Sequence, residues 1–138
     1  MGLVNLLGSS SFERLQSGLN AANLRNQVLV NNIGNVDTPH YKRSEVAFES
    51  LLQKEMNGVK STLSGNRTDA RHFVIGPSGR IPEPSIRTDQ TSAMNNNGNN
   101  VDVEREMALL AENQLRYNSY VQAVNNHIRI MRTAVEGR

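Results

Sequence analysis

Few residues of this chain are of types that do chemistry, and their spacing is not that of a catalytic or metal-binding site. The three histidines, His40, His72 and His127, lie far apart in the sequence, and none belongs to an HxxxH pair of the kind that binds metals on a helix. Cysteine is absent, which excludes disulfides and thiolate ligands for zinc. We therefore expect no bound metal and no cofactor.

The acidic residues Asp102, Glu104 and Glu106 are a second candidate, as a carboxylate cluster. Residues two positions apart on a helix point in different directions, so these three carboxylates do not converge on one ligand. Acidic side chains in the first turns of a helix stabilise the helix dipole, and this interpretation accounts for all three. The sequence also has no glycine-rich phosphate loop and no nucleophile motif. It predicts a protein that is not an enzyme and has no small-molecule substrate.

The composition argues against a compact globule that works alone. Of the 138 residues 37% are apolar and 4% are aromatic, which is little for the core of a domain of this length. The net charge of +2 arises from 15 basic and 13 acidic residues, and no basic run is present, so nucleic-acid binding is not indicated. We expect elongated helices whose burial is completed by other chains.

The clearest pattern in the chain is a heptad repeat between residues 103 and 135, following a helix start near Asn100 or Asp102. Its members recur with alternating spacings of four and three residues, and only a partner helix lying alongside rewards such a register. The repeat predicts a coiled-coil-like seam on a C-terminal helix. The members of this seam are Val103, Met107, Leu110, Gln114, Tyr117, Val121, Val124, Ile128, Met131 and Val135.

A second repeat of the same kind lies between residues 12 and 36. A capping box of Ser10 and Glu13 predicts the helix start, and Gly34 or Asn35 suits a left-handed residue at its end. We interpret the repeat as the partner seam, although an ordinary amphipathic helix over a small core shares the pattern over two turns. The members of this seam are Phe12, Leu15, Leu19, Ala22, Asn26, Leu29, Ile33 and Val36.

The chain reverses direction between the two helices, so we expect them to pack antiparallel. An unpaired buried amide costs about 1 to 3 kcal/mol, and polar members of a seam therefore prefer to face each other. This predicts that Asn26 lies opposite Gln114. In the same register Phe12 faces Ile128.

The end of the first helix carries the motif Asn32-Ile33-x-Asn35-x-x-Thr38-Pro39-x-Tyr41. This motif resembles the signature of the bacterial flagellar rod, hook and hook-filament axial proteins. Many members of that family have a glycine between the proline and the tyrosine, where this chain has His40. Residues 98–106 and 112–117 are similar to the family's C-terminal signature, and the stretch from Thr68 to His72 points to its proximal rod proteins.

The resemblance implies a structural subunit of the flagellar basal-body rod, which polymerises through its terminal helices and transmits torque from the inner-membrane ring to the distal rod and hook. The implied partners are other copies of the chain, other rod proteins, the inner-membrane ring or export-gate junction, and the flagellar type III export apparatus. The implied location is the basal body outside the cytoplasmic membrane, in the periplasmic or cell-wall space.

The N-terminus is compatible with that location. Residues 1–7 are apolar but lack a basic region and a cleavage site, so we expect export without a cleaved signal peptide. The competing hypothesis is a cytoplasmic helical adaptor or export chaperone that binds one partner helix in its groove.

The segment between the two helices has a mixed pattern. Residues 45–56 have the spacing of a short amphipathic helix that ends near Gly58, and residues 72–75 resemble a strand. Pro82 and Pro84 favour extended backbone, whereas the asparagines of residues 95–100 predict a loop or disorder.

The expected fold is mainly α. It is an elongated antiparallel pair of N- and C-terminal helices with a short extra helix and a long irregular middle segment that is partly β or disordered. The expected parts are an axial helix and turn (residues 1–43), a variable middle (44–100) and a second axial helix (101–138). Both terminal helices contribute to one structural domain.

Overall fold

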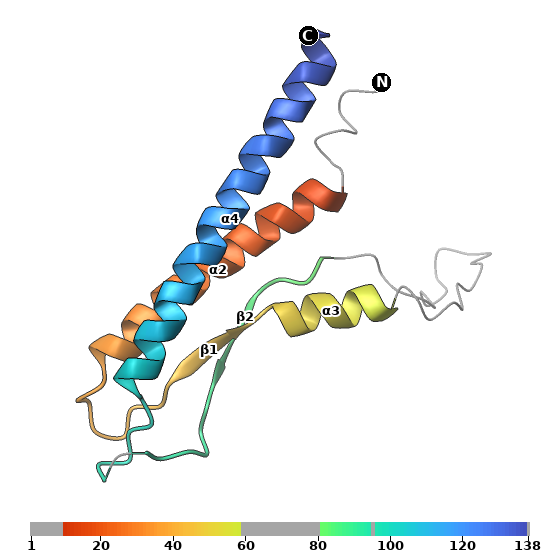
Figure 1. Ribbon diagram of the computed structural model, residues 1–138. Coiled ribbons are helices and arrows are strands. Elements are labelled where there is room, and N and C mark those ends of the chain that lie inside the picture. The colour runs from red at the N-terminus through yellow and green to blue at the C-terminus, as the bar shows by residue number, and fades with distance from the viewer. Residues whose placement is uncertain (1–9, 59–80, 95, 138) are drawn as a thin grey trace, which may run out of the picture.

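The computed structural model describes residues 10–58, 81–94 and 96–137. Within these residues it contains the helices α2 (Ser10–Gly34), α3 (Glu49–Gly58) and α4 (Val103–Glu136), and the strands β1 (Ser44–Ala47) and β2 (Ser85–Thr88). The helices α2 and α4 pack side by side and run in opposite directions (Figure 1). The predicted mainly α fold with an antiparallel pair of terminal helices is confirmed.

Capping residues set both ends of α4. The Asp102 side chain accepts a hydrogen bond from the backbone N–H of Arg105 at 3.2 Å, and Gly137 ends the helix in the left-handed conformation with φ 68°. With 34 residues α4 is longer than α2, which has 25. The last turns of α4 therefore extend past the first described turn of α2 (Figure 1).

The helix α2 ends at Gly34, as predicted, but it does so without a left-handed residue. The N–H groups of Asn35 and Val36 donate to the carbonyl oxygens three residues earlier, at 3.1 and 3.3 Å, and tighten the last turn. The left-handed residue of this turn is His40, with φ 58°. His40 occupies the motif position at which many members of the resembled family have glycine, so the chain keeps a left-handed turn there without one.

The predicted helix over residues 45–56 is wrong at its start. Residues 44–47 form β1, which pairs antiparallel with β2 so that Val46 lies opposite Ile86. The physical reason is alternation: Val46 and Phe48 are buried while Glu45 is exposed, which is the period of a strand. The helix α3 begins at Glu49 and ends at Gly58, as predicted, and it lies to the side of the helix pair (Figure 1).

The strand β2 directly follows Pro82 and Pro84, in agreement with the extended backbone expected there. All four of its residues are exposed, and β1 is the strand of this small sheet that packs closely on α2. The strand-like run of residues 72–75 lies outside the described residues.

The core is small, and it lies where α2 meets β1 and the first half of α4. Its buried apolar residues are Ala21, Ala22, Val28, Leu29, Val46, Phe48 and Val101. Polar residues are buried beside them, namely Asn32, Arg43, Asn99, Asn100, Glu106 and Asn113. Buried polar groups cost free energy unless they are hydrogen-bonded, so the partners of these six decide whether the fold is stable.

Gly98 gives a test of how closely the loop before α4 approaches the turn after α2. It has φ 77°, and a Cβ on it would lie 2.8 Å from Nδ1 of His40. Gly98→Ala should destabilise the protein by more than about 1 kcal/mol, because alanine is strained at positive φ and would meet the imidazole. Urea unfolding followed by circular dichroism measures the loss.

The matched control is Gly34→Ala, because a Cβ on Gly34 meets nothing within 4 Å. Alanine is the better helix former by about 1 kcal/mol, so this variant should be neutral or slightly more stable than the wild type. Equal stabilities of the two variants would contradict the close approach.

Candidate functional site

The helix α4 turns a different column of residues toward α2 from the one predicted. Residues 106, 113, 120 and 127 recur every seven positions, and each contacts α2. We call them the inner column. The contacts are Asn32 with Glu106, Ala22 with Asn113, Gly18 with Tyr120, and Phe12 with His127.

The predicted pairing of Asn26 with Gln114 is wrong. The amide that α4 buries is that of Asn113, and Gln114 is exposed. Asn113 donates from Nδ2 to the carbonyl oxygen of Ala22 at 2.8 Å, so a polar residue in this interface finds its partner in the backbone of α2. The register along the helices is close to the prediction, because Phe12 stacks on His127, one residue before the expected Ile128, with ring centroids 5.5 Å apart.

The predicted seam on α4 therefore divides into two sets. Every second member follows a residue of the inner column directly and lies about 100° further around the helix. We call this set the outer column: Met107, Gln114, Val121, Ile128 and Val135. Met107, Ile128 and Val135 are exposed by 58%, 43% and 60%, although they are apolar. The other set includes Leu110, Val124 and Met131, which are half-buried.

On α2 the predicted seam lies closer to the observed interface. Ala22 and Leu29 are buried. The remaining members are half-buried: Phe12, Leu15, Leu19, Asn26, Ile33 and Val36.

The carboxylate of Glu106 lies at the centre of a buried polar cluster, and its residue is 0% exposed. One of its oxygens accepts from Nε of Arg43 at 2.9 Å, and the other accepts from Nδ2 of Asn32 at 2.8 Å. Asn32 also accepts from the N–H of Ser44 and donates to its carbonyl oxygen, as a neighbouring strand would do. One carboxylate thus connects α4, α2 and the segment that enters β1. The assignment of Glu106 to the helix dipole alone is wrong.

The charges in this cluster stabilise one another. Burial alone would lower the pKa of Arg43, but the hydrogen bond and charge of Glu106 and the charge of Glu45 outweigh it, so the pKa is raised. Tyr41 donates its O–H to Oδ1 of Asn32 at 3.2 Å, and its pKa is raised by burial and by the charge of Glu106. Arg43 therefore stays charged and Tyr41 stays protonated at neutral pH, which keeps both donors in place.

Two asparagines of the expected loop, Asn99 and Asn100, are fully buried. The side chain of Asn99 donates to backbone carbonyl oxygens of the turn at 2.9 to 3.0 Å, those of Asn35, Val36 and Thr38. Asn100 accepts from the N–H of Arg43 at 2.6 Å and donates to the carbonyl oxygen of Asp89. The segment is a loop as predicted, yet these two amides fix it to the turn. We call Asn32, Tyr41, Arg43, Asn99, Asn100 and Glu106 the turn network.

The residues of the sequence motif lie in or beside this turn. Asn35 donates from Nδ2 to the carbonyl oxygen of Asn31 at 2.8 Å and accepts from the Thr38 hydroxyl at 3.2 Å. Pro39 is exposed and Ile33 is half-buried, while Asn32 and Tyr41 belong to the turn network. The motif therefore describes one side of the turn network, and the loop before α4 supplies the other.

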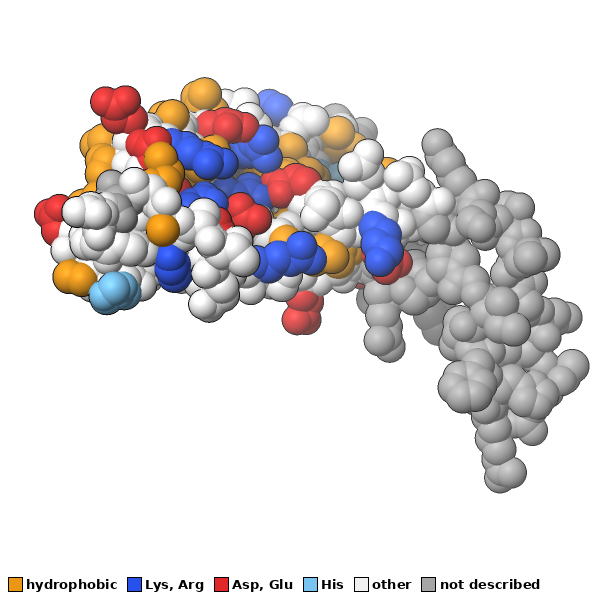
Figure 2. All heavy atoms as spheres, turned by 90° about the horizontal axis from the view of Figure 1, so that it is seen from below, with side chains coloured by type: hydrophobic (Ala, Val, Ile, Leu, Met, Phe, Trp, Pro, Cys, Tyr) orange, Lys and Arg blue, Asp and Glu red, His pale blue; other side chains and the backbone are white. Residues whose placement is uncertain are grey.

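A second ionic cluster holds the start of α3. Glu49 accepts from Arg25 of α2 at 2.5 Å and from Arg116 of α4 at 2.9 Å. Acidic and basic side chains lie side by side on the underside of the molecule (Figure 2). Partial burial alone would raise the pKa of Glu49, but the hydrogen bond and charge of Arg25 and the charge of Arg116 outweigh it, so the pKa is lowered.

Metal-ligating side chains do not gather at any one place in the described ranges. Among them, no group of three or more His, Cys, Asp or Glu side chains could hold a metal ion. No helix in the described ranges is long and apolar enough to span a membrane. Most polar groups of the turn network are directed at one another, so what the arrangement can do is hold two helices at a fixed turn and present their outer faces.

Relatives match most of the chain. It is 36% identical over 131 residues to the flagellar basal body rod protein FlgB of Bacillus subtilis, an alignment that covers 95% of this chain and 97% of that protein. The chain belongs to the FlgB family of flagellar basal body rod proteins. FlgB of Borreliella burgdorferi is 38% identical over 102 residues, covering 72% and 76%. FlgB of Cereibacter sphaeroides is 35% identical over 114 residues, covering 82% and 84%. No protein-family model matches the chain.

Removing the buried carboxylate tests the turn network. Glu106→Ala should destabilise the protein by about 3 to 5 kcal/mol, because it leaves the buried guanidinium of Arg43 without its closest counter-charge. Glu104→Ala is the control: it removes an exposed carboxylate from the same helix turn and should cost less than about 1 kcal/mol. Urea unfolding measures both, and similar losses would show that the network is not what stabilises this fold.

Glu49 makes the stability depend on pH in a predictable direction. Its folded-state pKa lies below the ordinary 4.5, so its contribution is present above that value and is lost as the pH falls through the folded-state pKa. Glu49→Gln should therefore lose less stability than the wild type between about pH 6 and about pH 3. Urea midpoints across this range measure the difference.

Asp89 remains in both proteins and does not affect that comparison. Its pKa is lowered by hydrogen bonds from the Ser92 hydroxyl and the Thr91 N–H. If the urea midpoints of the wild type and of Glu49→Gln change in parallel with pH, the role assigned to Glu49 is wrong.

Proposed function

We propose that this chain is a structural subunit of the proximal part of the flagellar basal-body rod, and that it polymerises through α2 and α4. The observation that carries the proposal is the outer column of α4, a stripe with a seven-residue period that is apolar except at Gln114 and of which Met107, Ile128 and Val135 are exposed. Membership of the FlgB family supports the setting, since the relatives are named as flagellar basal body rod proteins.

The outer column has the geometry of a second helix-packing face. A heptad stripe is rewarded only when another helix lies along it, and α2 already occupies the neighbouring inner column. Covering the exposed apolar side chains would gain about 25 cal/mol for each Å² removed from water. A helix from another subunit is the partner that matches the period and length of this stripe.

The outer column of one subunit would contact a different surface on the next subunit, and this difference determines the kind of assembly. If the outer column of one subunit meets a different surface of the next, the contact is heterologous and repeats without closing unless the rotation completes a ring. An open helical array of this kind is what a rod requires. Of the two seams predicted from the sequence, the outer column on α4 is proposed as the assembly surface on this basis, together with the half-buried members of the α2 seam. Ala22 and Leu29 are buried within the chain and are not part of it.

The turn network is proposed to keep the helix pair rigid within that array. Its motif residues, Asn32, Ile33, Asn35, Thr38, Pro39 and Tyr41, would fix the angle at which α2 leads into β1. The buried contacts of Glu106 with Asn32 of α2 and with Arg43 would resist sliding of α4 along α2 when the rod transmits torque from the inner-membrane ring to the distal rod and hook.

The finer parts of the proposal follow from the same role. The partners would be other copies of the chain, other rod proteins, the inner-membrane ring or export-gate junction, and the flagellar type III export apparatus. The subunit would act without enzymatic activity in the periplasmic or cell-wall space, reached without cleavage of a signal peptide. Residues 1–43 and 101–138 would form the axial part and residues 44–100 the variable part of one domain.

Two charges placed on the outer column test the assembly role. Met107→Glu combined with Ile128→Glu should leave the monomer's helix content and melting temperature nearly unchanged, because both residues are exposed and Glu is a good helix former. The variant should still be exported but should not be incorporated into basal bodies, and cells should lose motility. Purified basal bodies and soft-agar swimming provide the readouts.

The matched control adds the same charge to another face of α4. Gln122→Glu combined with Asn126→Glu changes exposed polar residues about 100° or more away from the outer column. Cells with the control should swim normally. Normal swimming with the outer-column variant would overturn the proposal, and a stable helical dimer of the free wild-type protein would favour an adaptor or chaperone instead.

A further inference from the structure

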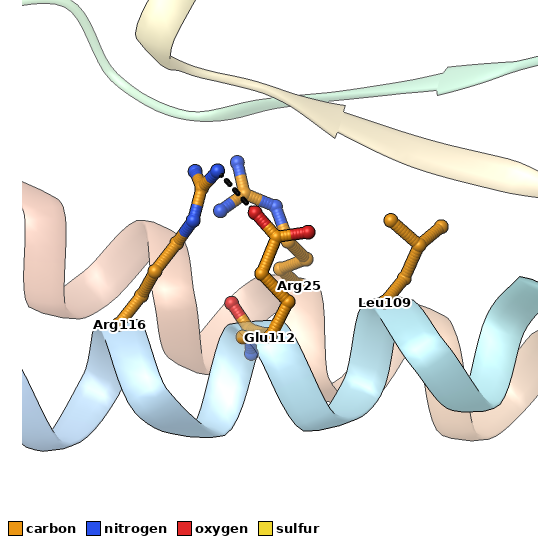
Figure 3. Close-up of a pocket in the computed structure, with 5 residues that line it drawn as sticks. Arg25, Leu109, Glu112 and Arg116 are labelled. Atoms are coloured by element: carbon orange, nitrogen blue, oxygen red, sulfur yellow. Dashed lines mark hydrogen bonds and ion pairs between the residues drawn. The ribbon is translucent and has the colours of Figure 1, made fainter.

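A small pocket between α2 and α4 contains a buried polar atom that has no hydrogen-bond partner among the described residues. The pocket has a volume of about 180 Å³ and is lined by Arg25, Leu109, Glu112, Asn113 and Arg116 (Figure 3). Asn113 is 2% exposed, and its Nδ2 donates to the carbonyl oxygen of Ala22. Its Oδ1 is also buried and accepts no hydrogen bond from the described residues. Such an acceptor costs about 1 to 3 kcal/mol, so the pocket is incomplete without a donor.

Hydrogen-bond donors lie at the rim of the same pocket. The guanidinium groups of Arg25, from α2, and Arg116, from α4, lie near the carboxylate of Glu112, and Leu109 lies at the other end (Figure 3). A guanidinium has five N–H groups. The described bonds of Arg25 all use Nη2, which leaves its Nε and Nη1 donors available. The pocket thus combines one buried acceptor with spare donors above it.

Charge complementarity decides which group fits. A carboxylate would bind the arginines, but it would place negative oxygens against Oδ1 of Asn113 and against Glu112. A cationic side chain would satisfy Oδ1, but it would face two guanidinium groups that already pair with the carboxylates of Glu49 and Glu112, so it would gain no counter-charge of its own. A neutral primary amide satisfies both ends, since its N–H donates to Oδ1 and its carbonyl accepts from Arg25. We propose that this pocket receives the side-chain amide of an asparagine or glutamine from a neighbouring subunit.

The position of the pocket indicates why the amide comes from another subunit. The pocket extends from Asn113 over Leu109, Glu112 and Arg116, which lie about 40° to 100° around the helix on the side away from Gln114. The pocket and the outer column therefore flank Asn113 on opposite sides. In an open array each subunit has neighbours on both sides. The outer column would meet one neighbour, and the pocket would hold a side chain from another. This inference rests on the proposed rod function.

Acetamide is the probe for the pocket in the isolated full-length chain. Titration with acetamide should shift the side-chain amide resonances of Asn113, whereas acetate and methylammonium at the same concentrations should not. Asn113→Leu should abolish any response of the Arg25 guanidinium signals to acetamide. An equal response to all three probes would show that the pocket does not select an amide, and no response to acetamide would show that it holds water only. Either result would overturn the proposal.

Asn113→Leu also separates assembly from folding. Leucine removes the unpaired acceptor, which favours folding, and also the bond to the Ala22 carbonyl, which opposes it, so the urea midpoint should stay close to that of the wild type. Incorporation into basal bodies should fall about tenfold or more. Leu109→Phe narrows the pocket and leaves the bond from Asn113 to Ala22 in place, and it should lower incorporation in the same way. This second variant keeps the test valid if Asn113→Leu fails to fold.

The outcomes distinguish this inference from the function on which it rests. If both pocket variants are incorporated like the wild type while the outer-column variant is not, only the pocket proposal fails. If the wild type itself is absent from basal bodies, the rod function fails whatever acetamide does. Losses of incorporation that merely follow losses of stability would make Asn113 a folding residue and would also overturn the pocket proposal.

Discussion

The rest of the structure depends on one buried carboxylate, that of Glu106. It accepts from Arg43 and from Asn32, and through them it connects the first turn of α4 with the end of α2 and the start of β1. A buried ion pair is not stabilising in itself, because desolvation of both charges offsets most of their attraction. The pair instead specifies the register of the two helices. Any other register of α4 on α2 would leave a buried charge without its partner.

Specificity of this kind matters because the apolar core is small. Phe48 is the one aromatic residue in it, and two of its seven members are alanines. Helices that share so few large side chains could slide or rotate at little cost in buried area. The amides of Asn32, Asn99 and Asn113 join α2 and the turn after it to α4 and the loop before it at fixed points, and a one-residue slip of α4 along α2 would break all of these bonds. Polar contacts therefore set the register, and apolar contacts supply the attraction.

The sequence predicts the two long helices, their antiparallel packing and the turn between them, because heptad spacing and the proline of the motif act locally. It does not predict the inner column. The inner column is more polar than the column beside it, so apolar spacing favours the other face, and only tertiary contact shows that Asn113 finds a carbonyl of α2 and that Glu106 finds Arg43. Asn99 and Asn100 were missed for the same reason, since asparagine-rich loops and asparagines that close a turn have the same composition. The strand β1 was missed because its partner β2 lies about forty residues away.

The inner and outer columns of α4 differ in polarity. The inner column consists of Glu, Asn, Tyr and His, and at Glu106 and Asn113 it makes directional bonds within the chain. The outer column is mostly aliphatic and makes few demands on geometry. A chain with the reverse arrangement would bury its apolar stripe against α2 and present polar residues whose hydrogen bonds water satisfies equally well. Placing the polar column inside leaves the apolar one exposed, so the fold that specifies the monomer also leaves the driving force for assembly on its surface.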